Sequence, residues 1–310
     1  MMTVVAADGY AYASLANGET VAPTPEPSAS SAWDLAFFAT TVTVNGGQAG
    51  PAGIAAHCIC QNQGASNPDV LAMTSASELA DFEAVGAADI PSASSAWSTD
   101  VLTPAIDGWV TGAGAEASLV DGKFWKLRLD DGESFSKLRI ASIEDMTATH
   151  AGTATIEYAV QETETSAFGP LRTITIDLAA GPVSVDLNAN AIVSAASWDV
   201  RVEGYTIRVN SGVSGAGQAG AASPEEGEDF ATLGSAVIAE QAYLADRYAG
   251  VFGEHPWYRY NLTGAHGVHP TFDVYLVRRG SSVFKLQLLN YYGPAGQARH
   301  ITFRYEQIAP

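Results

Sequence analysis

The sequence predicts an all-β protein made of two tandem copies of one antiparallel domain, with one or two short helices per domain. Three observations carry this prediction: short alternating runs rich in Val, Ile and Thr, turns rich in Gly and Asn between them, and an internal repeat. The chain has 310 residues, which exceeds the usual size of one domain and suits two domains of roughly 150 residues.

Alternation of apolar and polar side chains predicts the half-buried strands. They are expected in residues 40–45, 153–160, 205–210 and 300–308. Asn-Gly-Gly follows the first of these runs and Asn-Ser-Gly the third, and both tolerate the positive φ of a tight turn. Residues 126–143 and 272–292 each predict a hairpin, with turns around Asp131–Gly132 and Gly280–Ser282.

The helix prediction rests on two segments. Residues 236–252 are the best candidate, because apolar side chains there recur at helical spacing. The residues that roughly share one face are Val237, Ala242, Leu244 and Tyr248. Residues 74–85, TSASELADFEAV, are the expected partner helix in the first copy.

The internal repeat consists of two blocks that recur in the same order. The block that starts at Trp33 returns at Trp198 with a constant offset of 165, and LANG at Leu15 echoes LAAG at Leu178. A second block, from Trp109 to Tyr158, returns between Trp257 and Tyr305 with an offset of 148 for most of its length. The expected domains are therefore 1–164 and 165–310, with their boundary in the polar stretch 162–170.

Composition excludes several classes of function. The formal net charge of −19 would repel phosphate backbones and anionic lipids, so no nucleic-acid binding is expected. No segment approaches the length of a transmembrane span, and neither a signal peptide nor a lipid anchor is visible in this chain. The sequence lacks a G-x-S-x-G elbow, a phosphate-binding G-x-x-x-x-G-K loop and an H-E-x-x-H motif, so we expect no enzyme.

Two segments carry a resemblance to a known family. They are Ser-Ala-Trp-Asp-Leu-Ala-Phe leading to Val-Asn-Gly-Gly-Gln-Ala-Gly, in residues 31–50, and the block WYRYNLTGAHGVHPTFDVYLVRRGSSVFKLQLLNYY, in residues 257–292. Together they resemble the HmuY family of secreted haem-binding proteins, with 165–310 the closer copy and 1–164 the diverged one. The resemblance implies a secreted protein or outer-membrane lipoprotein of a Gram-negative bacterium. Such a protein captures haem, holds its iron between two axial His or Met side chains, and passes it to a TonB-type receptor for iron acquisition.

Histidines gather in the segment between His255 and Phe272. Haem iron accepts neutral imidazole, and the porphyrin faces need an apolar, often aromatic, pocket. His266 and His269 are the first candidates for the iron ligand, and His255 and Tyr258 are further candidates for haem binding. The candidate cofactor is therefore haem, and the candidate partners are haem or a haemoprotein.

The first copy does not repeat these histidines. At an offset of 148 it has Asp107, Ser118 and Asp121 in place of His255, His266 and His269. We therefore expect the second copy to be the principal haem binder. Met73 is a candidate ligand in the first copy, although methionine more often fills space in a core.

Cys58 and Cys60 are the only cysteines, and they are not part of the Cys-x-x-Cys-His motif that attaches c-type haem. A local disulfide is the first interpretation, a free thiol pair the second, and a metal-binding patch of His57, Cys58 and Cys60 the third.

Two functions are compatible with these patterns. The first is a secreted or cell-surface protein that binds and scavenges haem without catalysis. The alternative is a structural or accessory β-domain subunit of a surface or extracellular assembly that binds no haem.

Overall fold

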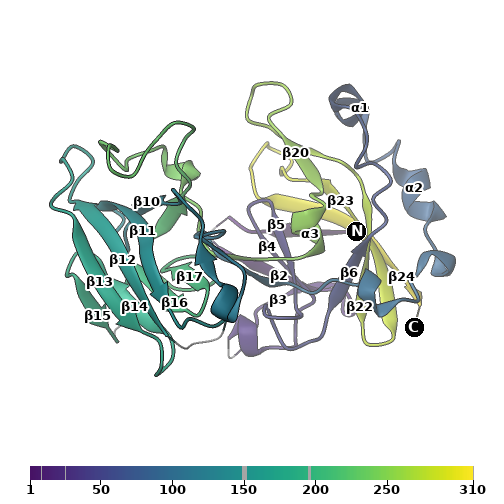
Figure 1. Ribbon diagram of the computed structural model, residues 1–310. Helices are drawn as coiled ribbons and strands as arrows, with labels where there is room; N and C mark the ends of the chain where they lie inside the picture. The colour runs from purple at the N-terminus through teal and green to yellow at the C-terminus, as the bar shows by residue number, and fades with distance from the viewer. Residues whose placement is uncertain (8, 25, 149–151, 195–196, 310) are drawn as a thin grey trace. The chain divides into compact units, whose positions relative to one another are not determined.

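The computed structural model describes the chain except for residues 8, 25, 149–151, 195–196 and 310 (Figure 1). Strands account for 38% of the residues and helices for 10%, which confirms the β-rich fold class. Three short α-helices occur in the described residues: α1 (Asn67–Ala72), α2 (Leu79–Ala84) and α3 (Val251–Glu254). Single 3-10 turns are η1 (Pro27–Ala29), η2 (Ala87–Asp89), η3 (Ser94–Ala96), η4 (Gly114–Glu116) and η5 (Glu240–Ala242).

The chain forms two compact units, and they differ from the consecutive domains 1–164 and 165–310 that the repeat suggested. Unit 1 consists of Met1–Leu102 and Tyr248–Pro310, and unit 2 consists of Thr103–Arg247. The chain passes from one unit to the other in β7 (Val101–Thr103) and β19 (Arg247–Ala249). Each unit therefore combines the N-terminal part of one repeat with the C-terminal part of the other.

The two largest sheets of unit 1 are antiparallel. The four-stranded sheet has the order β3-β2-β4-β5, and the five-stranded sheet has the order β1-β24-β23-β22-β6. The strands of the first are β2 (Ala11–Ser14), β3 (Glu19–Val21), β4 (Leu35–Phe38) and β5 (Thr41–Val44). Those of the second are β1 (Met2–Val5), β6 (Ala55–Cys58), β22 (Val274–Arg279), β23 (Ser282–Asn290) and β24 (His300–Ala309).

Unit 2 repeats this topology strand for strand. Its sheets have the orders β15-β14-β16-β17 and β13-β12-β11-β10-β18. The strands of the first are β14 (Val183–Asp186), β15 (Ala191–Val193), β16 (Val200–Glu203) and β17 (Thr206–Val209). Those of the second are β10 (Trp125–Arg128), β11 (Phe135–Glu144), β12 (Thr153–Gln161), β13 (Arg172–Asp177) and β18 (Gly220–Ala222). The sequence repeat is therefore also a structural repeat.

The predicted strands and hairpins are confirmed, but only one predicted helix is. Residues 74–85 contain α2, whereas residues 236–252 contain η5, β19 and the start of α3. In that segment the backbone of Leu244 exchanges two hydrogen bonds with Ala221 of β18. Pairing with a strand satisfies these backbone groups, and it outweighs the helical spacing of the side chains.

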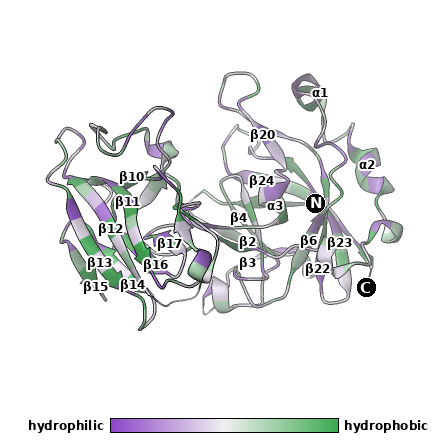
Figure 2. Ribbon diagram, in the orientation of Figure 1, coloured by the Kyte–Doolittle hydropathy of each residue, from purple (hydrophilic) through white to green (hydrophobic). Residues whose placement is uncertain are grey.

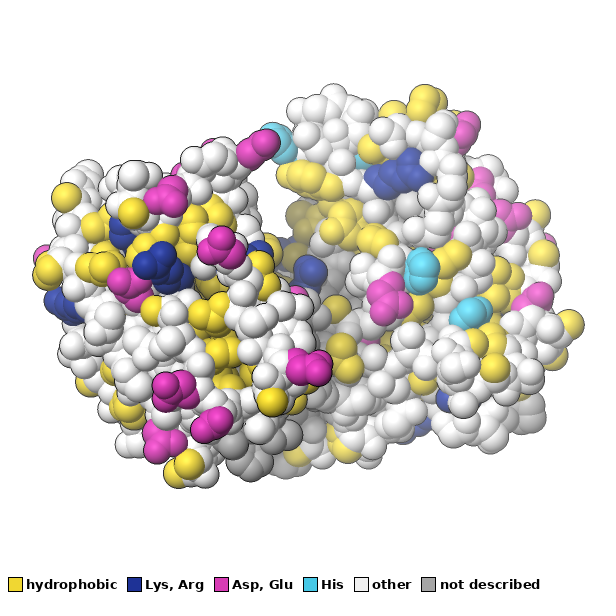
Figure 3. Space-filling view, viewed as in Figure 1, with side chains coloured by type: hydrophobic (Ala, Val, Ile, Leu, Met, Phe, Trp, Pro, Cys, Tyr) yellow, Lys and Arg dark blue, Asp and Glu magenta, His cyan; other side chains and the backbone are white. Residues whose placement is uncertain are grey.

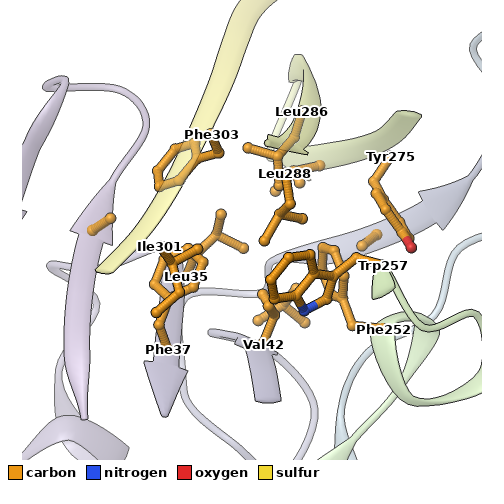
Figure 4. Packing of buried hydrophobic residues seen from close by; sticks show 14 of the residues in the cluster. Leu35, Phe37, Val42, Phe252, Trp257, Tyr275, Leu286, Leu288, Ile301 and Phe303 are labelled. Carbon is orange, nitrogen blue, oxygen red and sulfur yellow. The ribbon is translucent and has the colours of Figure 1, made fainter. Parts of the chain in front are cut away.

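The core of unit 1 consists of side chains from both of its segments, Met1–Leu102 and Tyr248–Pro310. Figure 4 shows Leu35, Phe37 and Val42 facing residues of β23 and β24, with Trp257 and Phe252 alongside. Trp257 and Phe303 are almost fully buried, at 1% and 0% exposure. In Figure 2, strands of both units carry hydrophobic and hydrophilic residues along their length, as two-sided strands require.

The repeated Trp-Asp and Asn-Gly motifs stabilise the turns of the four-stranded sheets. The side-chain amide of Asn45 donates to the carbonyl oxygen of Trp33 at 2.9 Å. A Cβ atom on Gly50 would lie only 2.0 Å from Asn45 Oδ1, and one on Gly215 only 1.8 Å from Asn210 Oδ1. Both glycines are required by this close approach, so these motifs maintain the fold and do not form a ligand site.

Buried carboxylates show which residues of the two repeats are equivalent. Asp34 accepts from the backbone N–H of Leu15 at 2.7 Å, and Asp199 accepts from that of Leu187 at 2.7 Å. The counterpart of Leu15 is therefore Leu187, and the echo proposed at Leu178 was wrong. The identical hydrogen bonds identify the positions more reliably than the four-letter similarity.

Asp100 and Asp246 form a second equivalent pair. Asp100 accepts from the N–H of Val44 at 2.9 Å and Asp246 from that of Val209 at 3.1 Å. Both are 1% exposed. Burial raises the pKa of Asp100 to about 7, against a weaker lowering by the Val44 hydrogen bond, and burial also raises the pKa of Asp246.

We expect Asp100→Asn to flatten the pH dependence of unit 1 stability. The native carboxyl keeps its proton up to about pH 7, whereas the unfolded one ionises near pH 4, so the native state binds more protons between these values. The free energy of unfolding therefore falls as pH rises through this window, by at most about 1.4 kcal/mol per pH unit. The free energy of unfolding, measured by urea unfolding at several pH values in this range, should change less with pH in the variant. An unchanged dependence on pH would contradict the assignment of this titration to Asp100.

Candidate functional site

An open cavity of about 610 Å³ lies in unit 1 beside the hairpin of β20 (Tyr258–Tyr260) and β21 (Val268–Pro270). This volume is within the range of small-molecule sites. Four tyrosines and one histidine contribute to its wall. The lining residues are Thr40, Tyr258, Tyr260, Ala265, His266, Val268, Tyr291, Tyr292 and Ala298.

Trp257 fixes the base of this hairpin. Its indole N–H donates to the carbonyl oxygen of Thr40 at 2.8 Å, and its own carbonyl accepts from the N–H of Thr271 at 2.9 Å. The hydroxyl of Thr40 also donates to the hydroxyl of Tyr258 at 3.0 Å. The wall that carries Tyr258 is therefore anchored to the four-stranded sheet through a buried aromatic residue.

The loop between β20 and β21 holds His266 in an unusual backbone conformation. Asn261 and His266 have φ values of 61° and 57°, in the left-handed region that non-glycine residues seldom adopt. Asn261 stabilises this conformation, because its side-chain oxygen accepts from the N–H of His266 at 2.8 Å and its N–H donates to Gly267 at 2.7 Å. The loop thus determines where the imidazole of His266 lies.

Tyr260 orients the imidazole of His266. The Tyr260 hydroxyl and His266 Nδ1 form a hydrogen bond of 3.0 Å, and the two rings are 6.0 Å apart. Because this bond uses Nδ1, the opposite nitrogen, Nε2, is the one that can meet a ligand. Tyr260 is 57% exposed, so the pair lies at the open rim of the cavity.

The four predicted haem-binding residues do not all converge. Tyr258 and His266 line the same cavity. His269 pairs with Arg259 in the β20–β21 ladder, next to the cavity-lining Val268, and so its side chain faces the other side of the hairpin. The Nε2 atom of His269 is buried without a hydrogen-bond partner in the described part of the chain.

His255 lies in a separate cluster. It caps the C-terminus of α3, and a ring nitrogen lies within 4.8 Å of the sulfurs of Cys58 and Cys60. The two cysteines form a disulfide, the interpretation placed first from the sequence. His57, which only the third interpretation placed with them in a metal patch, directs Nδ1 to the carbonyl oxygen of Ala96 at 2.8 Å.

Met73, the candidate ligand of the first copy, caps the C-terminus of α1 and does not line the tyrosine-lined cavity. Its backbone N–H donates to Asp69 at 3.1 Å, and its side chain is half-buried.

Unit 2 carries a shorter version of the same hairpin, in β8 (Val110–Thr111) and β9 (Ser118–Leu119). The backbone N–H of Val120 donates to the carbonyl oxygen of Trp109, just as the N–H of Thr271 donates to the carbonyl oxygen of Trp257. Residue numbers of equivalent positions therefore differ by 148 before the hairpin and by 151 after it. The unit 2 loop is therefore three residues shorter. This corrects the sequence alignment: Ser118 is the counterpart of His269, not of His266.

Sequence reasoning missed Tyr291, Tyr292 and Thr40 as lining residues. The two tyrosines follow β23 directly and pack edge to face at 5.1 Å, and the Tyr292 hydroxyl accepts from the N–H of Val268 at 3.0 Å. Thr40 comes from a distant part of the chain and is linked to the hairpin through Trp257 and Tyr258. A Tyr-Tyr pair next to a strand was the only available signal.

Charge does not mark a site. Acidic side chains are scattered over the face seen in Figure 3, as a formal net charge of −19 spread over the surface would give. Within the described residues, Cys58, Cys60 and His255 are the single group of three or more potential metal ligands. Aromatic character and one oriented imidazole therefore distinguish the tyrosine-lined cavity from the rest of the surface.

Comparison with known families agrees with the repeat. The family model described as HmuY protein matches residues 6–170 and 172–305. This chain belongs to the HmuY family and contains two tandem copies of its sequence. No curated protein is similar enough to count as a match.

Membership supports haem binding at the level of the family, whose proteins are non-enzymatic and extracellular or surface-exposed. No helix in the described ranges is long and apolar enough to cross a membrane. The two matches follow the order of the sequence, whereas each HmuY-like unit is assembled from parts of both copies.

Proposed function

We propose that this protein is a secreted or cell-surface haem-binding protein that scavenges haem without catalysis, and that unit 1 binds the haem in the tyrosine-lined cavity. The observation that carries the proposal is the oriented imidazole of His266 in a cavity walled by four tyrosines. This combination fits haem, because aromatic faces suit the porphyrin and an imidazole nitrogen suits its iron.

The two polar groups at the rim have different roles in this proposal. His266 presents Nε2 to the iron, while the hydroxyl of Tyr260 holds the ring through Nδ1, as outer partners of ligating histidines commonly do. A tyrosine oxygen can also ligate haem iron. Tyr260 is therefore the alternative ligand, and variants of the two residues distinguish the possibilities.

The partners and location follow from the family and belong to the same proposal. We place the protein at the outer-membrane surface of a Gram-negative bacterium or outside the cell, where it takes haem from a haemoprotein and delivers it to a TonB-type receptor. The exposed position of Tyr260 at the rim supports such a transfer, since a receptor can reach the bound haem.

The alternative function, an accessory subunit without haem, is supported by unit 2. That unit has the same two large sheets, but its β8–β9 loop is three residues shorter than the β20–β21 loop that carries His266. A fold maintained without the ligand residue indicates that the HmuY-like framework can serve as a structural module. Purification from the native source with a stoichiometric protein partner and no haem would favour this function.

We expect hemin to bind the wild-type protein saturably and His266→Ala to weaken binding by about tenfold or more, because removal of an iron ligand costs at least as much as removal of an outer partner. Titration followed at the Soret band measures both. Matched controls are His255→Ala and His269→Ala, whose side chains lie outside the cavity and should leave the spectrum unchanged.

Tyr260→Phe separates the two ligand assignments. If Tyr260 only orients His266, this variant keeps a histidine-type spectrum with reduced affinity. Loss of the wild-type spectrum in Tyr260→Phe but not in His266→Ala would assign the iron to Tyr260. The absence of any saturable change in the wild type would reject haem binding.

A further inference from the structure

A second cluster of chemically capable side chains in unit 1 lies outside the tyrosine-lined cavity. It consists of Cys58, Cys60 and His255, called here the sulfur cluster, whose sulfur and ring nitrogen atoms lie within 4.8 Å of one another. None of the three lines the cavity. Two thiolates and an imidazole are ligands that soft and borderline metal ions prefer.

The backbone brings the two sulfurs together. Cys58 ends β6 and is paired with Tyr275 of β22. Beyond it, the N–H of Ile59 donates to Val274 at 2.9 Å, and Cys60 has a φ of 60°, so the chain turns sharply after the strand. The turn returns Cys60 to the side of Cys58, where the disulfide joins them.

His255 is held beside the sulfurs by its own backbone. Its N–H donates to Val251 at 2.8 Å, and its carbonyl oxygen accepts from the Tyr275 hydroxyl at 2.7 Å. Tyr275, which is 0% exposed, therefore contacts both sides of the cluster: its backbone pairs with Cys58 and its hydroxyl fixes His255. These two hydrogen bonds fix the backbone of His255 independently of the disulfide.

The loop after Cys60 is fixed to the same corner. The carboxylate of Asp273 accepts from the N–H of Asn62 at 2.8 Å and from the side-chain amide of Gln63. That amide also donates to the carbonyl oxygen of Pro256, the neighbour of His255, at 3.3 Å. Asp273 and Gln63 thus connect the loop to the residue next to the imidazole, so the three ligands remain close when the S–S bond is open.

Unit 2 shows that the fold does not require this cluster. In its five-stranded sheet, Leu127 pairs with Ala221 and Lys126 with Ala222, so the register brings Ser223 to the place of Cys58. The same framework is built there without sulfur. Cys58 and Cys60 are therefore additions to the fold of unit 1.

We propose that opening of the Cys58–Cys60 disulfide creates a binding site for one monovalent copper ion in the sulfur cluster. An external dithiol attacks the half-buried Cys60 sulfur, and the S–S bond takes up two electrons and two protons while the dithiol closes into its own disulfide. Cu⁺ then replaces the two thiol protons, which pass to water, and neutral His255 donates its ring nitrogen.

The ligand set selects the metal. A structural zinc site is closed by four protein ligands, whereas the sulfur cluster offers three. Soft thiolates suit Cu(I) and Zn²⁺ alike, so the missing fourth protein ligand is what favours Cu(I) here. In the disulfide the sulfurs carry no charge and cannot act as thiolate ligands, so metal binding is coupled to the redox state.

The test uses the full chain, once oxidised and once reduced with dithiothreitol and desalted without oxygen. Cu(I) is supplied as its bicinchoninate complex, and loss of the colour of that complex measures copper transfer. We expect the reduced protein to take up one Cu(I) per chain and the oxidised protein to take up none. The double variant Cys58→Ser, Cys60→Ser should take up none in either state.

His255→Gln and His57→Gln form the decisive pair, because both keep the cysteines and His57 lies outside the cluster. His255→Gln should weaken Cu(I) binding by about tenfold or more, and His57→Gln should leave it unchanged. Equal transfer to the oxidised protein, no transfer to the reduced protein, or equal affinities of the two histidine variants would overturn the proposal. Hemin titration of the same samples reports on the cavity separately, so failure of one site does not imply failure of the other.

Discussion

A fragment of residues 103–247 is expected to fold by itself, whereas the sequence repeat 1–164 is not expected to form either native unit. The fragment is one continuous segment and contains all of unit 2, with its four-stranded and five-stranded sheets. Repeat 1–164 lacks β22, β23 and β24, which supply three of the five strands of the larger sheet of unit 1. Urea unfolding followed by circular dichroism should show a cooperative transition for 103–247 alone.

If repeat 1–164 closed on itself, Asp34 would lose the ion pair that it has in unit 1. In unit 1 the buried Asp34 forms a salt bridge with Arg279 at 2.6 Å. Arg279 pairs with Ser282 across the β22–β23 ladder. The first copy has Leu129 at the position of Arg279, since the N–H of Leu129 donates to Ser134 in the same way. Closure of 1–164 would replace this ion pair by the backbone N–H of Asp130, which donates to the equivalent Asp199 at 2.7 Å in unit 2.

The control is residues 165–310, a fragment of nearly the same length as 103–247, which also crosses the unit boundary and should behave like 1–164. If 1–164 unfolds as cooperatively as 103–247, the two parts of one repeat can form a complete unit, and the exchange of parts between repeats is not required for folding. That result would support 1–164 and 165–310 as domains.

Much of the fold was predictable because it depends on local patterns. The strands at 40–45, 153–160, 205–210 and 300–308 follow side-chain alternation, which reflects the two faces of each strand. The repeat, too, was visible from sequence alone. The sequence did not indicate which N-terminal part packs with which C-terminal part, because the segments around Trp33 and Trp198 are so similar. Only long-range hydrogen bonding between strands distinguishes the observed exchange of parts from closure of each repeat on itself.

Part of the lining of the tyrosine-lined cavity could be anticipated for the same reason. Tyr258 and His266 are close in sequence and lie on one hairpin, so a local cluster located both. His269 does not line the cavity, because strand alternation turns its side chain away from that of Val268. The partnership of His255 with Cys58 depends on the pairing of β6 with β22, across about two hundred residues of chain, and no local pattern signals it.

Trp257→Ala should be the most damaging single substitution in unit 1. The side chain is 1% exposed and lies in the core between the sheets (Figure 4). Removing a buried tryptophan costs about 3–5 kcal/mol, and the carbonyl oxygen of Thr40 also loses its donor. Because Trp257 anchors the hairpin that carries Tyr258, Tyr260 and His266, hemin binding should be lost together with stability.

Trp109→Ala is the matched control, since Trp109 is the counterpart of Trp257. It is 2% exposed and its indole N–H donates to Tyr205 at 3.1 Å. Its loss should destabilise unit 2 by a similar amount, measured by urea unfolding, while hemin titration gives the wild-type affinity. If Trp109→Ala abolishes hemin binding as Trp257→Ala does, then unit 1 is not sufficient for the site. If both variants bind hemin normally, the tyrosine-lined cavity is not where haem binds.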